Sequence, residues 1–205
     1  MSYRDQVTRI IAGRARGARL DVPSSGTRPT SDRVRESLFG ALESMDVIDG
    51  ARVLDLYAGS GALGLEAWSR GAESVELVEL SRPAANIVRR NAALVAKAMQ
   101  SDLAARVHQS TVRSYLGHAA GSFDVVFTDP PYDLTDDAMN GDLVALAPLL
   151  SPDAVVVIER GKRASAPDLH TAGLELLREK TYGDTAVWWA QPVLESGQND
   201  PSQSR

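Results

Sequence analysis

Residues 53–64 of the chain read Val-Leu-Asp-Leu-Tyr-Ala-Gly-Ser-Gly-Ala-Leu-Gly, and this stretch decides the fold. The pattern of residues 53–57 predicts a short buried strand, and the small residues after it form a loop that opens a helix near Ala62. The spaced glycines match G-x-G-x-x-G, and they are Gly59, Gly61 and Gly64. Glycine lets the main chain approach a ligand, and a helix N-terminus offers free amides, so the stretch predicts a nucleotide-binding loop. A purely structural turn between strand and helix is the alternative.

Strands and helices alternate on the C-terminal side of this loop. We expect strands at residues 52–57, 74–79, 106–109, 123–128 and 154–159, helices at 62–70, 83–100 and 136–146, and a final antiparallel pair at 174–177 and 185–190. Strands separated by helices form a parallel sheet that is covered on both faces. The sequence therefore predicts an α/β fold, a doubly wound, Rossmann-like and mostly parallel seven-stranded sheet.

The N-terminal part has a different pattern. Within residues 8–22, short apolar runs around glycines predict a small β-hairpin, and a helix with one apolar stripe follows from about residues 30–32. We expect residues 1–26 to form a separate arm and residues 27–192 to form the main domain. Residues 193–205 are polar and lack periodicity, which predicts a disordered tail.

Composition excludes several classes of protein. The chain of 205 residues is 43% hydrophobic, enough for a full core, and it has no cysteine, so disulfides and cysteine nucleophiles are excluded. The three histidines lack the spacing of metal ligands, so we expect no metal site. No apolar run has the length of a membrane span, and no signal peptide is evident, so we expect a cytoplasmic protein, which we predict to be monomeric.

The charge is distributed unevenly. The net charge is −5, but residues 1–35 hold eight arginines against three aspartates, so they carry +5 and the other 170 residues carry −10. A basic arm on an acidic body predicts that the arm binds a polyanion such as RNA, although a merely solvated terminus has the same composition. The arginines that we expect to contact RNA are Arg9, Arg14, Arg16, Arg19, Arg28, Arg33 and Arg35.

Three carboxylates fall at or near the carboxyl ends of predicted strands, where open parallel sheets bind ligands. Asp55 lies near the end of the first strand, Glu79 ends the second, and Asp129 follows the fourth. Glu79 lies about twenty residues after the first loop glycine, the spacing of an acid that accepts hydrogen bonds from ribose hydroxyls. An ordinary charged strand terminus is the alternative for Glu79.

The sharpest motif is Asp129-Pro130-Pro131-Tyr132, directly after a buried strand. Prolines fix φ and have no amide proton, so this loop is rigid and presents hydrogen-bond acceptors without competing donors. Such a loop suits a ligand with its own donors, for example an exocyclic amine, and the Tyr132 ring can stack on a planar base. A stiff surface turn is the alternative.

Taken together, Asp55, Gly59-Ser60-Gly61, Glu79 and residues 129–132 resemble the motifs of S-adenosylmethionine-dependent methyltransferases that act on amino nitrogens of bases. The N-terminal runs at residues 10–20 and 28–39 narrow the resemblance to the RsmD family, which methylates guanine N2 in small-subunit (16S) ribosomal RNA. This resemblance covers roughly residues 8 to 191.

The resemblance implies the Rossmann-like methyltransferase fold and a cofactor, S-adenosylmethionine. The implied cofactor site comprises Asp55, Tyr57, Gly59, Ser60, Gly61, Glu79, Leu80, Ser110, Thr111 and Asp129. The implied catalytic loop is Asp129, Pro130, Pro131 and Tyr132. Many such enzymes have an acid after the third strand that binds the adenine amine, whereas this chain has Ser110-Thr111, so hydroxyl or main-chain groups would take that role.

The mechanism that the resemblance implies is positioning. The Asp129 carboxylate and the Pro130 carbonyl would hold the amine hydrogens of a single-stranded or flipped guanine and turn its lone pair toward the methyl group. Three other functions remain open from the residues alone. They are an adenine-N6 methyltransferase on DNA or RNA, an NAD-dependent oxidoreductase that uses the glycine loop, and a nonenzymatic RNA-binding module that uses the arm.

Overall fold

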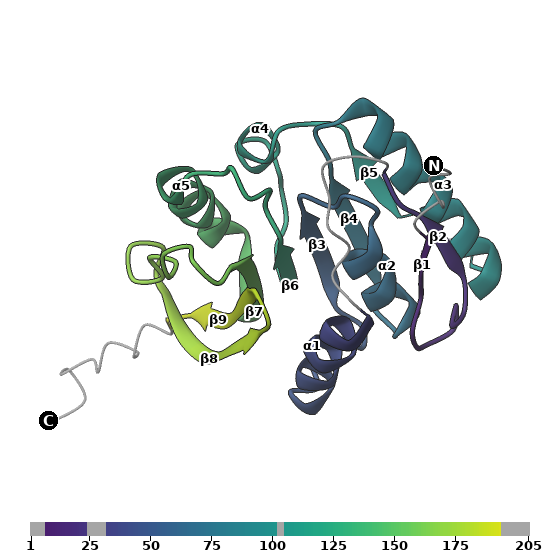
Figure 1. Cartoon of the computed structure of the whole chain (residues 1–205), viewed down its shortest axis with the longest axis horizontal. Coiled ribbons are helices and arrows are strands. Elements are labelled where there is room, and N and C mark those ends of the chain that lie inside the picture. The colour runs from purple at the N-terminus through teal and green to yellow at the C-terminus, as the bar shows by residue number, and fades with distance from the viewer. Residues whose placement is uncertain (1–6, 24–31, 102–104, 194–205) are drawn as a thin grey trace, which may run out of the picture.

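A seven-stranded sheet is the centre of the computed structural model, which describes residues 7–23, 32–101 and 105–193 (Figure 1). Its strand order is β5-β4-β3-β6-β7-β9-β8. The strands are β3 (Arg52–Leu56), β4 (Ser74–Val78), β5 (Arg106–His108), β6 (Phe123–Thr128), β7 (Leu150–Gly161), β8 (Leu174–Tyr182) and β9 (Thr185–Pro192). Strands β3 to β7 run parallel, and β9 is antiparallel to β7 and β8. The predicted α/β, doubly wound, mostly parallel sheet is confirmed.

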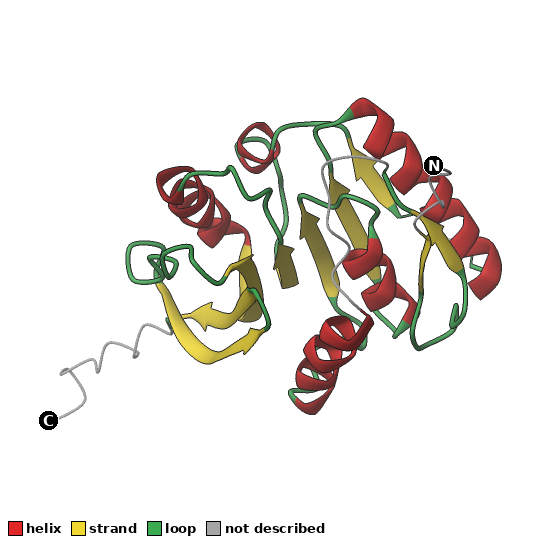
Figure 2. Ribbon diagram, viewed as in Figure 1, coloured by secondary structure: helices red, strands yellow, loops and turns green. Residues whose placement is uncertain are grey.

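Helices cover both faces of the sheet, and each face has its own hydrophobic core (Figure 2). Helices α1 (Asp32–Ser44), α2 (Ala62–Ser69) and α3 (Arg82–Met99) pack on one face, together with residues such as Val53 and Leu77 of the sheet. Helices α4 (Val112–Leu116) and α5 (Asp136–Leu146) pack on the other face, against Leu54 and Leu56. Successive strand residues point to opposite faces, so one strand supplies both cores.

Three elements differ from the sequence expectation. Helix α4 was not predicted, because its five residues are too few to show a helical period. A short 3-10 helix, η1 (Ala147–Leu149), leads directly into β7, which begins at Leu150 instead of 154. Strand β8 extends to Tyr182, five residues beyond the predicted end at 177. The sequence did not reveal this extension, because β8 forms an edge of the sheet, where most of its side chains are exposed and show no alternation.

The predicted N-terminal hairpin is present as β1 (Val7–Arg9) and β2 (Arg19–Asp21), which pair antiparallel. It lies beside α2 and α3 (Figure 1) and contributes to the core, since Ile10 and Leu20 are fully buried. The amides of Ile11 and Ala12 donate hydrogen bonds to Glu66 of α2. The hairpin is therefore anchored to the helix that follows the glycine loop.

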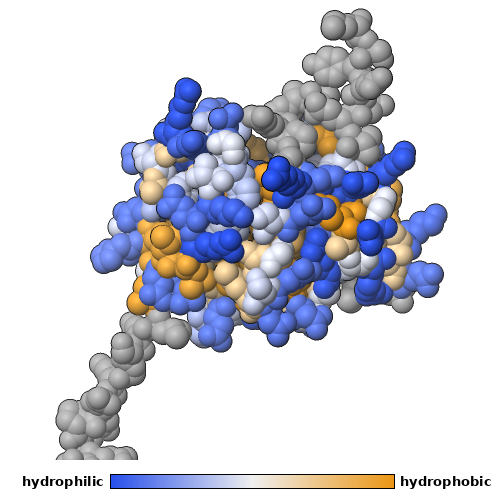
Figure 3. Space-filling view, turned by 60° about the horizontal axis from the view of Figure 1, so that its bottom comes forward, coloured by the Kyte–Doolittle hydropathy of each residue, from blue (hydrophilic) through white to orange (hydrophobic). Residues whose placement is uncertain are grey.

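The surface seen in Figure 3 is mostly hydrophilic, with separate apolar areas toward its left and toward its right. Large apolar side chains that β8 exposes are Leu176 and Leu177. In the part of the chain that the structure describes, no helix is long and apolar enough to cross a membrane.

Candidate active site at the carboxyl edge of the sheet

The register of the central strands brings the predicted site residues to one edge. Leu56 of β3 is aligned with Val78 of β4 and with Thr128 of β6. The next residues along these three strands are Tyr57, Glu79 and Asp129, so they follow at the same level. The chain leaves β3 toward β4 on one side, and β6 lies on the other side of β3. This is the switch point at which open α/β sheets bind ligands.

Glu79 fixes the glycine loop to the end of β4. One oxygen of its carboxylate accepts a hydrogen bond from the Gly59 amide at 3.0 Å, and the other accepts one from the Ser81 amide at 2.7 Å. Gly59 has a φ of 58° and Gly61, which caps α2, has a φ of 79°. The neighbouring Leu80 exposes 65% of its surface, so an apolar side chain stands uncovered beside a carboxylate.

Two of the loop glycines are required by packing. A Cβ at Gly61 would lie 3.1 Å from side-chain atoms of Leu65 and Leu77, within the core. A Cβ at Gly64 would lie 3.0 Å from the Cβ of Asp55, so α2 approaches β3 closely there. These glycines therefore allow the turn and the close packing of α2 on β3. The space that a side chain at Gly61 would need is occupied by Leu65 and Leu77.

Asp55 is buried, with an exposed fraction of 2%, and its carboxylate accepts the Gly64 amide at 2.9 Å. Burial raises the pKa of Asp55 to about 7; the hydrogen bond from Gly64 opposes this shift and the charge of Glu79 adds to it. Asp55 is thus held beneath the glycine loop, where it ties β3 to the first turn of α2.

Tyr57, Ser110 and Thr111 already have partners within the protein. Tyr57 has a φ of 62°, and its hydroxyl donates a hydrogen bond to Asp142 of α5. Burial and this contact raise the pKa of Tyr57. Thr111 caps α4 by accepting the Ser114 amide at 3.1 Å, and the Ser110 hydroxyl donates to the Thr111 carbonyl at 3.0 Å. Both of these residues follow β5, at the same edge of the sheet as Glu79.

The loop at residues 129–132 presents an aromatic ring on a fixed base. Pro130 is buried, whereas Tyr132 exposes 69% of its surface. The Pro131 carbonyl accepts the Leu134 amide at 3.0 Å, which closes a turn. Arg160 of β7 then donates to the Leu134 carbonyl at 2.9 Å and to Asp136 at 3.1 Å. The loop is therefore held from β7 as well as from β6.

Sequence reasoning missed Arg160 and Asn91. Arg160, only 8% exposed, was visible as a charge at the end of the apolar run of β7. Asn91 of α3, 2% exposed, donates to the carbonyls of Asp21 and Ser60 and accepts the Asp21 amide at 3.0 Å. It therefore joins the hairpin to the glycine loop. In the described chain, no group of three or more His, Asp or Glu side chains is placed to hold a metal ion.

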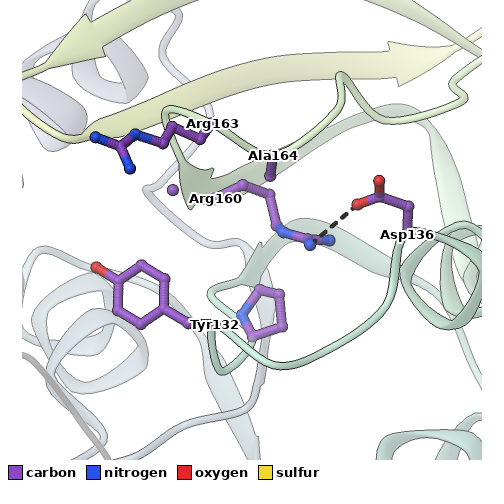
Figure 4. A pocket seen from close by; sticks show the side chains of 7 residues that line it. Tyr132, Asp136, Arg160, Arg163 and Ala164 are labelled. Carbon is purple, nitrogen blue, oxygen red and sulfur yellow. Dashed lines mark hydrogen bonds and ion pairs between the residues drawn. The ribbon is translucent and has the colours of Figure 1, made fainter.

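A pocket of about 310 Å³ lies between the loop and the end of β7 (Figure 4). Its lining residues are Pro130, Tyr132, Asp136, Arg160, Gly161, Arg163 and Ala164. In Figure 4 the Arg160 guanidinium points toward Asp136, whereas Arg163 extends toward the side on which the Tyr132 ring lies. The pocket thus combines an aromatic ring with an arginine that projects away from the Arg160–Asp136 ion pair.

Six of the seven arginines expected to contact RNA divide into three groups. Arg16, Arg19 and Arg33 are exposed. Arg9 pairs with Asp32 at 3.3 Å while remaining 66% exposed, and Arg14 donates to the Met99 carbonyl at 2.7 Å. Arg28 lies outside the described residues.

The expectation that Arg35 faces a ligand is wrong. It is 1% exposed, and it donates to the Thr8 hydroxyl and the Arg9 carbonyl at 2.8 Å each. Position 35 lies one helical turn before Leu38 and Phe39, so the hairpin that packs there covers it. Arg35 therefore anchors the hairpin to α1 and is not available to a surface phosphate in this structure.

Comparisons with known proteins agree on one family. A family model described as "Conserved hypothetical protein 95" matches residues 8–191. "Ribosomal RNA small subunit methyltransferase D" of Escherichia coli K12 is 40% identical over 181 residues, which cover 87% of this chain and 86% of that protein. "Putative rRNA methyltransferase YlbH" of Bacillus subtilis is 35% identical over 87% of this chain and 96% of its own length. The solved structure "Putative methyltransferase yhhF from Escherichia coli" has a TM-score of 0.76 at 34% identity and covers 91% of this chain and 98% of its own.

Proposed function

This chain belongs to the family described as conserved hypothetical protein 95, the RsmD family, and we propose that it methylates the exocyclic N2 of a guanine in 16S ribosomal RNA. The chain is an S-adenosylmethionine-dependent methyltransferase, and ribosomal RNA of the small subunit is its substrate. One observation supports the amine chemistry above all. The acceptor-rich loop at residues 129–132 follows β6, directly beside the glycine loop that follows β3.

The residues at the edge of β3 and β4 fit S-adenosylmethionine, which supplies an electrophilic methyl group on a sulfonium. We propose that Glu79 accepts hydrogen bonds from the ribose hydroxyls and that Leu80, being apolar and exposed, packs on the adenine ring. Gly59, Ser60 and Gly61 bring the main chain near the cofactor, with Asp55 holding the loop from below and Tyr57 at its entrance. Ser110 and Thr111 lie where the adenine edge is expected, and Asp129 lies between cofactor and substrate.

The loop would act on the base by positioning. The Asp129 carboxylate and the Pro130 carbonyl accept the two amine hydrogens and so orient the nitrogen lone pair, which is otherwise conjugated into the guanine ring. Pro131 keeps the turn rigid, and the exposed Tyr132 ring offers a stacking surface worth about 1–3 kcal/mol per base. Such orientation of two reactants supplies much of the rate without a covalent intermediate. The target guanine must be unstacked to reach this loop.

We propose that the N-terminal arm (residues 1–26) contributes to RNA binding and that residues 27–192 form the methyltransferase domain. The exposed arginines Arg16, Arg19 and Arg33, with Arg9, Arg14 and Arg28, would supply the contacts to phosphate. Their positive charge offsets the acidic remainder of the chain. We further propose that the protein acts as a monomer in the cytoplasm, where ribosomal subunits assemble.

Methyl transfer in vitro tests the proposed base and atom. The protein would be incubated with labelled S-adenosylmethionine and small ribosomal subunits from cells that lack it, and the RNA would be digested to nucleosides. We expect the label in N2-methylguanosine, at one position that mass spectrometry of RNA fragments then locates. Label in N6-methyladenosine would instead support the alternative adenine-N6 activity. Protein-free RNA as a second substrate shows whether the assembled particle is required.

A further inference from the structure

Helix α3 carries charge of one sign only. Its 18 residues include no acid and four cations, which are Arg82, Arg89, Arg90 and Lys97. The chain beyond residue 35 is strongly acidic as a whole, so α3 differs in charge from the rest of the main domain. Surface helices are often stabilised by opposite charges three or four residues apart, and α3 can form no such pair within itself.

The four cations lie on the side of α3 that faces away from the sheet. With 3.6 residues per turn, positions 82, 89, 90 and 97 fall within a sector of about 100° around the helix axis. All four residues are exposed, whereas the opposite side of the helix is buried through residues such as Val88 and Val95. The cations extend over about 22 Å of the axis, from residue 82 to residue 97. We call this side, defined by the four cations, the basic face of α3.

The basic face of α3 continues onto the N-terminal hairpin, which lies beside the helix (Figure 1). Arg14 of the hairpin donates a hydrogen bond to the Met99 carbonyl at the end of α3. The exposed Asp21 of β2 pairs with Arg90 at 3.7 Å. Arg19 comes two residues before Asp21 on the same strand, so its side chain projects to the same side. Exposed cations of the hairpin and of α3 therefore form one continuous surface.

The other three cations of the basic face form no ion pair with a carboxylate among the residues that the structure describes; Arg90 alone has one. Arg82 is the first residue of α3, where the helix dipole favours an acid over a cation, so helix stability does not explain its position. The preceding Ser81 caps the helix and donates its amide to Glu79, the residue proposed to bind the ribose. The basic face therefore begins next to the cofactor site and leads away from it.

The chemistry of this face favours the backbone of a nucleic acid. Cations clustered along one side of a helix are the usual footprint of phosphate binding. Guanidinium groups bind phosphate oxygens through paired, charge-assisted hydrogen bonds. Helix α3 contains no aromatic residue on which a base could stack. The face is therefore suited to phosphates and not to the recognition of bases.

We propose that the basic face of α3, together with Arg19 of the hairpin, binds the sugar–phosphate backbone of small-subunit ribosomal RNA away from the target guanine. The inference rests on the proposed function and adds a second basic element to the arginines near the N-terminus. Because α3 begins beside the cofactor site, contacts along it fix the direction in which the RNA crosses the protein. They thereby help to bring the guanine to the loop at residues 129–132.

Binding of small ribosomal subunits and of protein-free 16S ribosomal RNA tests the proposal. Both would come from cells that lack this protein, and S-adenosylhomocysteine would replace the methyl donor so that no turnover occurs. We expect Arg89→Gln/Lys97→Gln to weaken binding on the order of tenfold or more. The slope of log K against log salt should fall by roughly 1.4 to 1.8, from 0.7 to 0.9 per contact. The matched control is Arg178→Gln/Lys180→Gln, because it removes one arginine and one lysine from β8, at the opposite edge of the sheet from β5, on which α3 packs.

Ala93→Glu tests the same face without removing a cation. Ala93 is exposed, and a glutamate four residues before Lys97 forms a favourable pair with it, so urea denaturation should show a fold at least as stable as that of wild type. The new carboxylate repels phosphate, so RNA binding should weaken nonetheless. Ala93→Gln places an uncharged side chain of the same length there and should bind RNA as wild type does. Affinity for S-adenosylmethionine should be unchanged in every variant.

Equal salt slopes for Arg89→Gln/Lys97→Gln and the β8 control, or normal RNA binding by Ala93→Glu, would overturn the assignment of α3 while wild-type methylation stands. A loss with subunits, alongside protein-free RNA that binds wild type and the α3 variant equally tightly, would overturn it too, because the partner of α3 would then be a ribosomal protein. A wild-type protein that methylates no guanine in these subunits would overturn the proposed function itself.

Discussion

The carboxylate of Glu66 accepts a hydrogen bond from the main-chain amide of Ile11 at 2.7 Å, and thereby joins helix α2 to the N-terminal hairpin. Glu66 is fully buried and also pairs with Arg70 at 2.8 Å. A buried carboxylate with several donors is costly to leave incomplete. The hairpin that sequence reasoning treated as a separate basic arm is therefore part of the structure that supports the glycine loop.

Removal of the Glu66 carboxylate should destabilise the contact between α2 and the N-terminal hairpin. In Glu66→Ala, the amides of Ile11 and Ala12 and the buried Arg70 lose an acceptor, and we expect a loss of about 3–5 kcal/mol in the free energy of unfolding. Glu43→Ala is the control, since Glu43 also pairs with Arg70 but is 53% exposed, so we expect a loss of at most about 1 kcal/mol. Urea denaturation measures both. Equal losses in the two variants would contradict a role for burial at Glu66.

The cofactor assignment predicts a selective effect at Glu79. Glu79→Ala removes the acceptor proposed for the ribose hydroxyls and the contact that orders Gly59, so S-adenosylmethionine affinity should fall about 10- to 100-fold. Glu73→Ala is the control, because Glu73 precedes β4 and so lies at the opposite end of the same strand. Titration calorimetry gives both affinities. If Glu79→Ala binds the cofactor as tightly as Glu73→Ala does, the ribose is held elsewhere.

The catalytic loop should show the reverse pattern. Asp129→Ala removes a proposed acceptor of the amine hydrogens, so single-turnover methylation should slow on the order of 100-fold, with cofactor affinity within a few-fold of wild type. Asp133→Ala removes the same charge from an exposed position of the same loop and should leave the rate near that of wild type. Near-normal methylation by Asp129→Ala would exclude this carboxylate from the reaction.

The exposed arginines of the hairpin can be tested without truncation. Deletion of residues 1–26 would remove Ile10 and Leu20 from the core and leave Glu66 without its amide donors, so it would test folding as well as RNA binding. The double variant Arg16→Gln/Arg19→Gln changes only exposed side chains. If both contact phosphate, the salt slope of RNA binding should fall by roughly 1.4, from 0.7 per contact for single strands. Arg178→Gln, on β8, is the control, and an identical slope in both variants would remove the hairpin from RNA recognition.

The central strands were predictable because burial on both faces leaves continuous apolar runs, as in Val125-Val126-Phe127 of β6. Their parallel direction followed from the alternation of strand and helix. Strand β8 and helix α4 were mispredicted because an exposed edge strand and a five-residue helix leave no period to detect. The anchoring of the hairpin was also missed, although a glutamate inside the apolar helix Ala-Leu-Gly-Leu-Glu-Ala-Trp-Ser was a visible signal.

The site residues that come directly after a predicted strand could be placed from the sequence. Glu79 and Asp129 could be placed at one edge because parallel strands share their carboxyl ends. Arg160 and Asn91 could not be placed. Arg160 binds the main-chain carbonyl of Leu134. Asn91 binds the carbonyls of Asp21 and Ser60, and contacts to main-chain groups leave no pairing pattern in a sequence. Arg35 was misassigned because its burial depends on how the hairpin packs, which no helical period reveals.

Asp55 should make the stability of the protein depend on pH. Its pKa rises from 3.8 to about 7 on folding, chiefly through burial, so the folded state binds a proton more tightly than the unfolded state does. The stabilisation that results is complete below pH 3.8 and is lost as the pH rises through about 7. Asp55→Asn keeps an acceptor for the Gly64 amide but cannot ionise. Relative to this variant, the wild-type protein should lose on the order of a few kcal/mol of unfolding free energy over that interval.

Urea denaturation at a series of pH values measures the difference between the two proteins, and Asp124→Asn supplies a control of opposite sign. The hydrogen bonds from Arg52 lower the pKa of Asp124 to about 2, so its contribution to stability is lost only as the pH falls from 3.8 toward that value. The curves of wild type and Asp124→Asn should therefore run parallel between about pH 4 and pH 7, while those of wild type and Asp55→Asn diverge. If the Asp55→Asn curve also runs parallel to wild type there, the carboxyl beneath the glycine loop ionises as freely in the folded protein as in the unfolded chain.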